Sequence, residues 1–333
     1  MLAYIIRRLL NAVLTLLVVT LVTFGIFFMV PKITGSDPAL LYIGKTADAV
    51  SVEGIRTKLG LADPVIVQYG KFLKGLVVGR DYANGPDVTH CPAPCMGYSF
   101  KTDEEVTPKL LGDLPVTISL AIGAAVIWLI MGVGAGVISA LRKGSLLDRA
   151  VMSTALAGVS MPIYFTALLS SAIFVYWLEW LPNPAYTPFT ENPVQWASGL
   201  ILPWITLAFL FAATYARLTR ANMLETLGED YIRTARAKGL RERSVISKHA
   251  LRSGLTPIIT IFGLDLGALL GGAILTETAF NLHGIGLQAL TAIRGNDLPI
   301  IIGVTLIAAF FIVIINLIVD LLYGVIDPRV RLS

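Results

Sequence analysis

The chain offers few side chains for catalytic or metal chemistry, because its 333 residues include only two Cys and three His. Cys91 and Cys95 lie close together in the stretch "HCPAPC", next to His90. In an oxidising compartment two such thiols form a disulfide, and in a reducing one they stay free. A structural zinc site takes four ligands, and His90 with the two thiols supplies three. We therefore predict a disulfide, with free thiols as the alternative and a metal site as the least favoured reading.

A second chemical signal is the tail of a phosphate-binding loop, Gly44-Lys45-Thr46. The full pattern requires another glycine five residues before Gly44, but that position is Ala39. No other Gly-Lys pair followed by Ser or Thr occurs in the chain. We therefore expect no ATP binding by this route, no bound cofactor or metal, and no catalytic residues, so the chain is not predicted to be an enzyme.

Two carboxylates in apolar surroundings are candidates for contact with a transported solute. Asp265 lies inside the run "GLDLGALLGGAIL", and Glu277 follows the same run. An ionisable residue inside a membrane segment is a functional candidate by default. The alternative for Asp265 is a hydrogen bond between helices, to a neighbouring subunit or to a Ser or Thr. Asn316 and Asp320, one helical turn apart in another apolar run, are predicted to be a packing pair.

The densest charge in the chain lies in "DYIRTARAKGLRERSVISKHALRSGLTP", Asp230–Pro257, and nine Lys or Arg occur from Arg217 to Arg252. Acidic residues at the start and Arg236 near the end complement the dipole of a first helix. Gly239 stands where a left-handed C-cap is expected. A second helical run, Arg241–Leu251, places Val245, Ile246, His249 and Ala250 on one face. The pattern predicts a helix, a glycine turn and a second helix.

Three interpretations of this charged block compete. A solvated loop needs only a few basic residues and no paired helices. A DNA-binding helix-turn-helix is excluded, because only a few residues separate each helix from a neighbouring apolar run. The third interpretation is a docking element for another protein, since the small residues Ala235, Ala237 and Gly239 permit close approach.

The composition is that of an integral membrane protein. Hydrophobic residues make up 55% of the chain and charged residues 14%, with a mean hydropathy of +0.75, whereas soluble domains carry about 25% charged residues. A spanning helix needs about 20 apolar residues. Six segments qualify, and none contains Lys or Arg: Leu9–Val30, Leu114–Leu141, Ala150–Leu178, Ala197–Ala216, Leu255–Thr276 and Pro299–Val319. We predict an all-α fold of six transmembrane helices.

The short loops set the orientation, because Lys and Arg concentrate on the cytoplasmic side of a membrane. Outside the charged block, Arg7, Arg8, Arg142, Lys143, Arg149, Arg329 and Arg331 fall on the same predicted side. The short loops of the opposite side carry only Arg294, and the long loop 31–105 does not count, because long loops cross the membrane regardless of charge. Both termini are therefore predicted to be cytoplasmic. We divide the chain into residues 1–30 with the first span, an outer loop at 31–105 with the Cys pair, and a five-helix core at 106–333 that includes the loop 217–252. The net charge of +4 then needs no nucleic-acid partner.

The stretch "RTARAKGL…HALRSGLTP" resembles the signature loop of ABC-importer permeases, in particular the B-subunits of the dipeptide, oligopeptide and nickel permease family. In the general pattern Glu-Ala-Ala precedes the glycine, and here Arg233, Thr234 and Ala235 occupy those places. The general pattern ends in a proline, and here Arg252 stands there. Both departures are typical of the peptide permeases. Further similarity lies in "GSDPA", "DLPVTISLAI", "TETAFNLHGIG" and "DLLYGVIDPRVR", while residues 79–100 resemble an insertion.

The resemblance implies a type I importer permease in a bacterial inner membrane, forming half of a pore for di- or oligopeptides. Its implied partners are a homologous permease, an extracellular solute-binding protein, and two cytoplasmic ATPase subunits that use ATP and Mg²⁺. The ATPase would dock on six residues, Ile232, Ala235, Arg236, Ala237, Gly239 and Leu240. The alternative is an ion-coupled secondary transporter of small solutes, which would need ionisable residues near the midplane and repeated broken helices. Asp265 is the only carboxylate inside a predicted span, so the sequence gives this alternative little support.

Overall fold

The computed structural model describes residues 2–26, 63–84, 87–99 and 101–326, together with Ala39, Gly54 and Arg56. Gly44-Lys45-Thr46, most of the predicted outer loop before Asp63, and Arg329 and Arg331 lie outside the described residues. The chain divides into two compact units. The first comprises Met1–Thr117, Leu270–Ile274 and His283–Ser333, and the second comprises Ile118–Leu269 and Leu275–Leu282.

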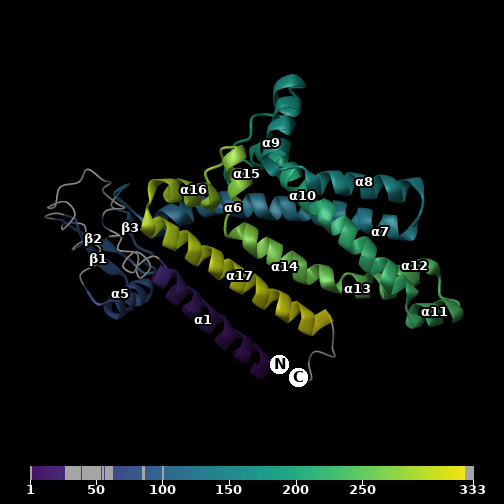
Figure 1. The fold of residues 1–333 in the computed structure, drawn as a ribbon, viewed down its shortest axis with the longest axis horizontal. Coiled ribbons are helices and arrows are strands. Elements are labelled where there is room, and N and C mark those ends of the chain that lie inside the picture. The colour runs from purple at the N-terminus through teal and green to yellow at the C-terminus, as the bar shows by residue number, and fades with distance from the viewer. Residues whose placement is uncertain are drawn as a thin grey trace. The chain divides into compact units, whose positions relative to one another are not determined.

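Two long apolar helices of the first unit, α1 (Leu2–Phe24) and α17 (Leu298–Ile326), lie side by side (Figure 1). Arg8 of α1 forms an ion pair with Asp320 of α17 at 2.7 Å. The sequence alone predicted Asp320 as a packing partner of Asn316. That packing stays a prediction, and the structure adds a cation on the neighbouring helix as a partner of the carboxylate, which sequence spacing within α17 cannot reveal.

The shorter helix α16 (Ile285–Gly295) completes the core of this unit. Its buried face packs against α17 and the first turns of α6 (Val106–Trp128), in a cluster of Val106, Leu110, Ile285, Ala289, Ala292, Ile300, Val304 and Ile307. The backbone N–H of Ile285 donates to Thr117 Oγ1 at 2.9 Å, which ties the start of α16 to α6. α16 ends at Asn296, whose left-handed φ of 54° stops the helix.

Residues 65–105 of the first unit form what we call the outer cap. It contains α5 (Val65–Val78) and two antiparallel hairpins, in which β1 (Arg80–Asn84) pairs with β2 (Asp87–Cys91), and β3 (Tyr98–Ser99) pairs with β4 (Glu104–Glu105). The sequence reading recognised an insertion here but did not predict strands. Apart from these short hairpins, the described residues are mainly helical, as predicted.

The second unit is built from helices that follow one another along the sequence. α6 continues through a π-helical turn at Leu129–Val133 into α7 (Gly134–Leu141). The helices that follow are α8 (Leu146–Ser160), α9 (Ile163–Ser171) with a π-helical extension Ala172–Trp177, α10 (Pro193–Gly228), α11 (Asp230–Ala237), α12 (Glu242–Ser244), a π-helical turn Val245–Ala250, α13 (Leu251–Gly254), α14 (Thr256–Leu270) and α15 (Ile274–Ala279).

Local sequence explains where α10, the longest helix of this unit, begins. The side chain of Asn192 accepts hydrogen bonds from the N–H groups of Val194 and Gln195, both at 3.1 Å, and Pro193 occupies the first turn. An Asn cap followed by Pro is a favoured helix start. Inside the unit, Trp128 of α6 stacks on Phe211 of α10 at 4.6 Å between ring centroids and meets Phe262 of α14 edge-on.

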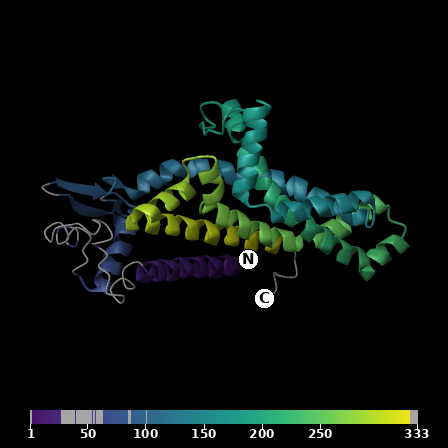
Figure 2. The ribbon, with the colours of Figure 1, turned by 45° about the horizontal axis from the view of Figure 1, so that its top comes forward.

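Four described helices are long and apolar enough to cross a membrane, and two bent pairs raise the number to six if each pair is one span. The third predicted span is corrected in detail: α8 and α9 meet at a bend of 103° rather than forming one straight helix. Figure 2 shows α9 directed away from the axis of α8. Pro162 at the break lacks the N–H that would continue α8. The predicted fifth span, Leu255–Thr276, corresponds to α14, which ends at Leu270, and the chain bends by 48° just before it, between α13 and α14.

Candidate functional site

The predicted helix, glycine turn and helix of the charged block are present. α11 runs from Asp230 to Ala237, and Gly239 follows with φ +73°, the left-handed conformation predicted for it. The N–H of Gly239 donates to Arg236 O at 2.9 Å, and the N–H of Leu240 donates to Ala235 O at 3.3 Å. These bonds close the end of the helix. We call Asp230–Gly254 the docking segment.

One face of the docking segment is buried within the second unit. Ile232 is 0% exposed and Ala235 is 7% exposed. They pack in a cluster with Ala140 of α7, Met223 of α10, and Val245 and Ala250 of the second helical run. The predicted apolar face of that run is therefore confirmed at Val245 and Ala250, although its backbone is π-helical.

Burial corrects part of the predicted docking surface. Ile232 and Ala235 point into the apolar cluster, because the hydrophobic residues of α11 recur at the spacing of one helix face. They anchor the segment and are not available to a partner. Arg236, Ala237, Gly239 and Leu240 are exposed, together with Tyr231 and Arg233, which the sequence reading did not include.

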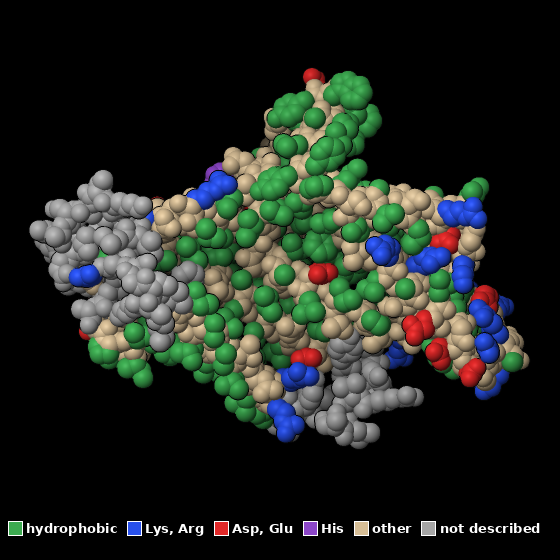
Figure 3. Space-filling model, in the orientation of Figure 1, with side chains coloured by type: hydrophobic (Ala, Val, Ile, Leu, Met, Phe, Trp, Pro, Cys, Tyr) green, Lys and Arg blue, Asp and Glu red, His purple; other side chains and the backbone are tan. Residues whose placement is uncertain are grey.

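The exposed face carries charged side chains on both sides of Gly239, which has free space beyond its Cα. A Cβ placed on Gly239 would meet no atom within 4 Å, so the surface beyond it is open. Arg236 donates to Glu242 from Nη2 at 2.7 Å and from Nε at 3.2 Å, which joins the two helices across the turn. These hydrogen bonds raise the pKa of the Arg236 guanidinium. Figure 3 shows Lys, Arg, Asp and Glu side chains interspersed at this end of the second unit.

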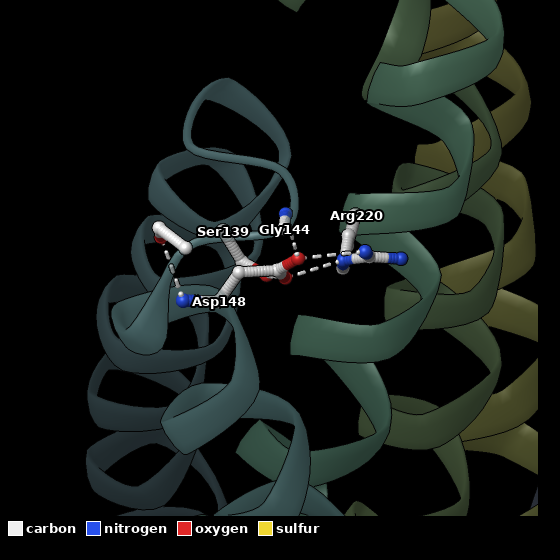
Figure 4. Close-up of polar contacts among 5 residues, drawn as sticks. Ser139, Gly144, Asp148 and Arg220 are labelled. Atoms are coloured by element: carbon white, nitrogen blue, oxygen red, sulfur yellow. Dashed lines mark hydrogen bonds and ion pairs between the residues drawn. The ribbon is translucent and has the colours of Figure 1, made fainter.

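Beside the docking segment lies a buried polar group that the sequence reading missed, centred on Asp148 in the first turn of α8 (Figure 4). Arg220 of α10 donates to both carboxylate oxygens, from Nε at 2.7 Å and from Nη2 at 2.9 Å. Ser139 of α7 donates to the same carboxylate, and the N–H of Gly144 donates to it at 2.8 Å. We call these four residues the Asp148 clamp. It joins α7, α8, the turn between them, and α10.

Glycines allow α7, and the π-helical turn before it, to approach α10 closely beside the clamp. A Cβ on Gly132 would lie 2.8 Å from Ala212 O, and one on Gly136 would lie 2.6 Å from Ala216 O. Real Cβ atoms do not come this close to backbone oxygens, so both positions require glycine. Small residues at helix interfaces are the usual means of close packing in membranes. The two helices therefore form a tightly joined pair.

The two acidic candidates for a translocation path have different surroundings. Asp265 of α14 is partly buried, and Tyr215 of α10 donates a hydrogen bond to it at 2.8 Å. The bond is between helices, as the alternative interpretation expected, but the partner is a tyrosine within the same chain. Glu277 of α15 is 0% exposed, so in this structure it faces no open path. A path role for either residue stays a prediction.

In the outer cap, Cys91 and Cys95 are joined by a disulfide, with their Cα atoms 5.6 Å apart. Both are buried, against Tyr82 and Tyr98. The N–H of Cys95 donates to Gly75 O at the end of α5, at 3.2 Å. Asp81 forms a hydrogen bond to His90. In the described part of the chain, no group of three or more His, Cys, Asp or Glu is arranged to hold a metal.

The fold has a counterpart among solved structures. The structure matches a chain of "Inward facing conformations of the MetNI methionine ABC transporter" with a TM-score of 0.54 and 16% sequence identity. The match covers 66% of this chain and 97% of that chain. At this identity the likeness concerns the fold alone, which this chain shares with a chain of an ABC transporter.

The family follows from sequence. The profile described as "Binding-protein-dependent transport system inner membrane component" matches residues 129–332, and its N-terminal counterpart matches residues 1–121. The chain belongs to this family of membrane-spanning permeases. A dipeptide transport system permease protein of Alkalihalophilus pseudofirmus is 39% identical, over 99% of this chain and 100% of its own length. A Brucella abortus (strain 2308) chain, named as a peptide transport system permease, is 39% identical over 99% of both chains.

Proposed function

We propose that the chain is one permease subunit of an ATP-driven importer of di- or oligopeptides and forms half of the pore. The names of its full-length relatives support the substrate class. The family supports a cell-membrane location, and the positions of Lys and Arg in the short loops support cytoplasmic termini. The ion-coupled alternative is not retained, since both the family and the fold are those of importer permeases.

The partners follow from the same assignment. We infer a second homologous permease, an extracellular solute-binding protein, and two cytoplasmic ATPase subunits that bind ATP and Mg²⁺. The chain itself would carry no catalytic residue. Its tasks would be to bind the ATPase on one side and to let the solute pass between two helical subunits.

The observation that carries the proposal is the two-sided docking segment. One side, with Ile232 and Ala235, is anchored on α7 and α10. The opposite side, with Arg236, Ala237, Gly239 and Leu240, is exposed and presents charge around an open glycine. A rigid element with one face free can transmit motion from a bound protein to the helices beneath it. We propose that this exposed face binds the ATPase.

The test is ATP hydrolysis and peptide uptake by the complete importer reconstituted in lipid. Gly239→Asp places a charged side chain at the open position, and we expect normal membrane insertion with loss of stimulated hydrolysis and of uptake. Gly228→Asp controls for the added charge, because Gly228 also has open space beyond its Cα but lies at the end of α10. Gly239→Ala controls for the backbone, because it strains the same left-handed turn without adding a charge, and it should keep most of the uptake. Uptake that is unchanged in Gly239→Asp would contradict the proposal.

A further inference from the structure

The Asp148 clamp lies outside the docking segment and outside the surface proposed to meet the ATPase. We propose that it is a positioning device that makes α8 move as one body with the docking segment. Asp148 and Arg220 are then positioning residues for coupling between ATP hydrolysis and transport. This inference rests on the proposed function of the docking segment.

The clamp adjoins the cluster that anchors the docking segment. Arg220 precedes Met223 by three residues on α10, and Ser139 immediately precedes Ala140 on α7. Met223 and Ala140 are the α10 and α7 members of the cluster that holds Ile232 and Ala235. A force applied to α11 therefore acts on the same two helices that supply the clamp's partners.

The close packing of α7 against α10 explains why a force applied to α11 would move both helices together. At Gly136, α7 lies against the backbone O of Ala216, the Cβ of Thr219 and the backbone N of Arg220. Displacing one helix without the other would require these backbone contacts to open. α7 and α10 thus form a rigid pair, which we call the base, and the docking segment packs against one end of it.

Asp148 is the polar link between α8 and this base. The turn between α7 and α8 includes Gly144 at φ +81°, with no atom within 4 Å of its Cβ position. Among the described residues of α8, Asp148 is the side chain with polar contacts to other helices. Four hydrogen bonds to one carboxylate tie α8 to α7, to the turn and to α10 at a single point.

The contacts of α8 beyond this point are apolar. A pocket of about 260 Å³ lies between α7, α8 and α10, lined mainly by small residues that include Ala150, Ala155 and Ala212. Farther along, α8 approaches α10 closely at Gly158, where a Cβ would lie 3.0 Å from Ala213. Apolar contacts between small side chains are not directional, whereas the clamp fixes both the position and the orientation of the start of α8. From there α8 leads to the 103° bend before α9.

The alternative is that the clamp only stabilises the fold, since a buried ion pair whose partner is removed leaves an uncompensated charge. The two roles predict different behaviour of folded protein. A stabilising role lowers the amount of folded permease in proportion to lost transport. A positioning role leaves docking intact and weakens the transfer of motion from α11 to α8.

The experiment uses the complete importer in lipid nanodiscs. Spin labels at Leu146, which is 82% exposed at the start of α8, and at Leu240, which is 44% exposed in the docking segment, report whether the two move together. We expect a narrow Leu146–Leu240 distance distribution that is the same without nucleotide and with bound ATP. Asp148→Asn, which removes the charge but keeps the size, should broaden it and lower uptake per ATP hydrolysed by about tenfold.

Three further measurements make the outcome decisive. Cross-linking from Leu240→Cys to the ATPase should be equal in wild type and in Asp148→Asn, whereas its absence in wild type would contradict the proposed docking surface itself. If Asp148→Asn does not fold, Ser139→Ala supplies a milder loss of one hydrogen bond. Asp148→Glu, which keeps the charge, should recover part of the coupling. An unchanged distance distribution with unchanged uptake per ATP, in folded Asp148→Asn, would overturn the clamp proposal alone.

Discussion

The docking segment and the outer cap are both compact attachments to long helices, but different interactions hold them. The docking segment is held by an apolar cluster around Ile232 and lies beside a buried ion pair, Asp148 with Arg220. The outer cap is held by a disulfide and by backbone hydrogen bonds at the end of α5. The first arrangement joins several helices at one point, and the second stiffens a short stretch of chain. The difference fits the proposed role of the docking segment, in which motion passes to several helices, whereas the disulfide of the outer cap acts locally.

The largest effect is expected where backbones touch, at Gly136 in the base under the docking segment. Gly136→Leu would drive a side chain against Ala216 O and should destabilise the permease by about 3 kcal/mol. Gly134→Leu is the control, because a Cβ there meets nothing within 4 Å. Thermal unfolding followed in detergent measures both. Equal melting temperatures for the two variants would show that α7 and α10 are not tightly joined.

In the outer cap, loss of the disulfide should have a smaller and local effect. Replacing Cys91 and Cys95 with Ser should lower the free energy of unfolding of the cap by about 2 kcal/mol, because the loop between them is short. Limited proteolysis of the cap with and without reductant measures this. The double Ser variant should be insensitive to reductant, and its stimulated ATP hydrolysis should match wild type. A loss of stimulation would mean that the cap also takes part in coupling.

Within the second unit, the hydrogen bond between Tyr215 and Asp265 separates a packing role from a path role. If it only joins α10 and α14, Tyr215→Phe and Asp265→Asn should each cost about 1 kcal/mol of stability, with little change in uptake. Melting temperature and uptake are compared in the same preparations. A selective loss of uptake in Asp265→Asn, at wild-type stability, would instead place Asp265 on the translocation path.

The smallest effect on stability is expected at the exposed pair Arg236 and Glu242. Exposed ion pairs contribute little to stability, so Arg236→Ala should leave the melting temperature unchanged. Because the pKa of Arg236 is raised by Glu242, its positive charge should persist over the whole range in which the protein is folded. The amount of ATPase that co-purifies with the permease should therefore show no titration of Arg236 near neutral pH. A melting temperature lowered as far as in Gly136→Leu would contradict this ranking.

Much of the fold could be predicted from sequence because membrane helices follow simple rules. Apolar length marked the spans, and Gly239 marked the turn, since a left-handed residue after a helix favours glycine. The bend between α8 and α9 was missed, although Met161-Pro162 offered a signal for it. The strands of the outer cap were missed because short hairpins leave a weak pattern.

The site was harder to predict because its key contacts join residues far apart in the chain. Asp148 and Arg220 are separated by 72 positions, and nothing in either local sequence identifies the other. Arg8 and Asp320 show the same limit. Ile232 and Ala235 illustrate a different one: their motif predicts importance, but only burial shows that they face inward. The available hint for Asp148 was a single carboxylate in a loop that otherwise carries basic residues, Arg142, Lys143 and Arg149.

The central claim is that the exposed face of the docking segment, and no other described face, meets the ATPase. The direct measurement is cysteine cross-linking in the assembled importer, with single Cys at Ala237, Leu240, Ala235 and, in the outer cap, Val77. We predict ATPase cross-links from Ala237 and Leu240, and none from buried Ala235 or from Val77, which is 77% exposed. Cross-links from Val77, or none from Leu240 in an importer that hydrolyses ATP on stimulation, would contradict the claim.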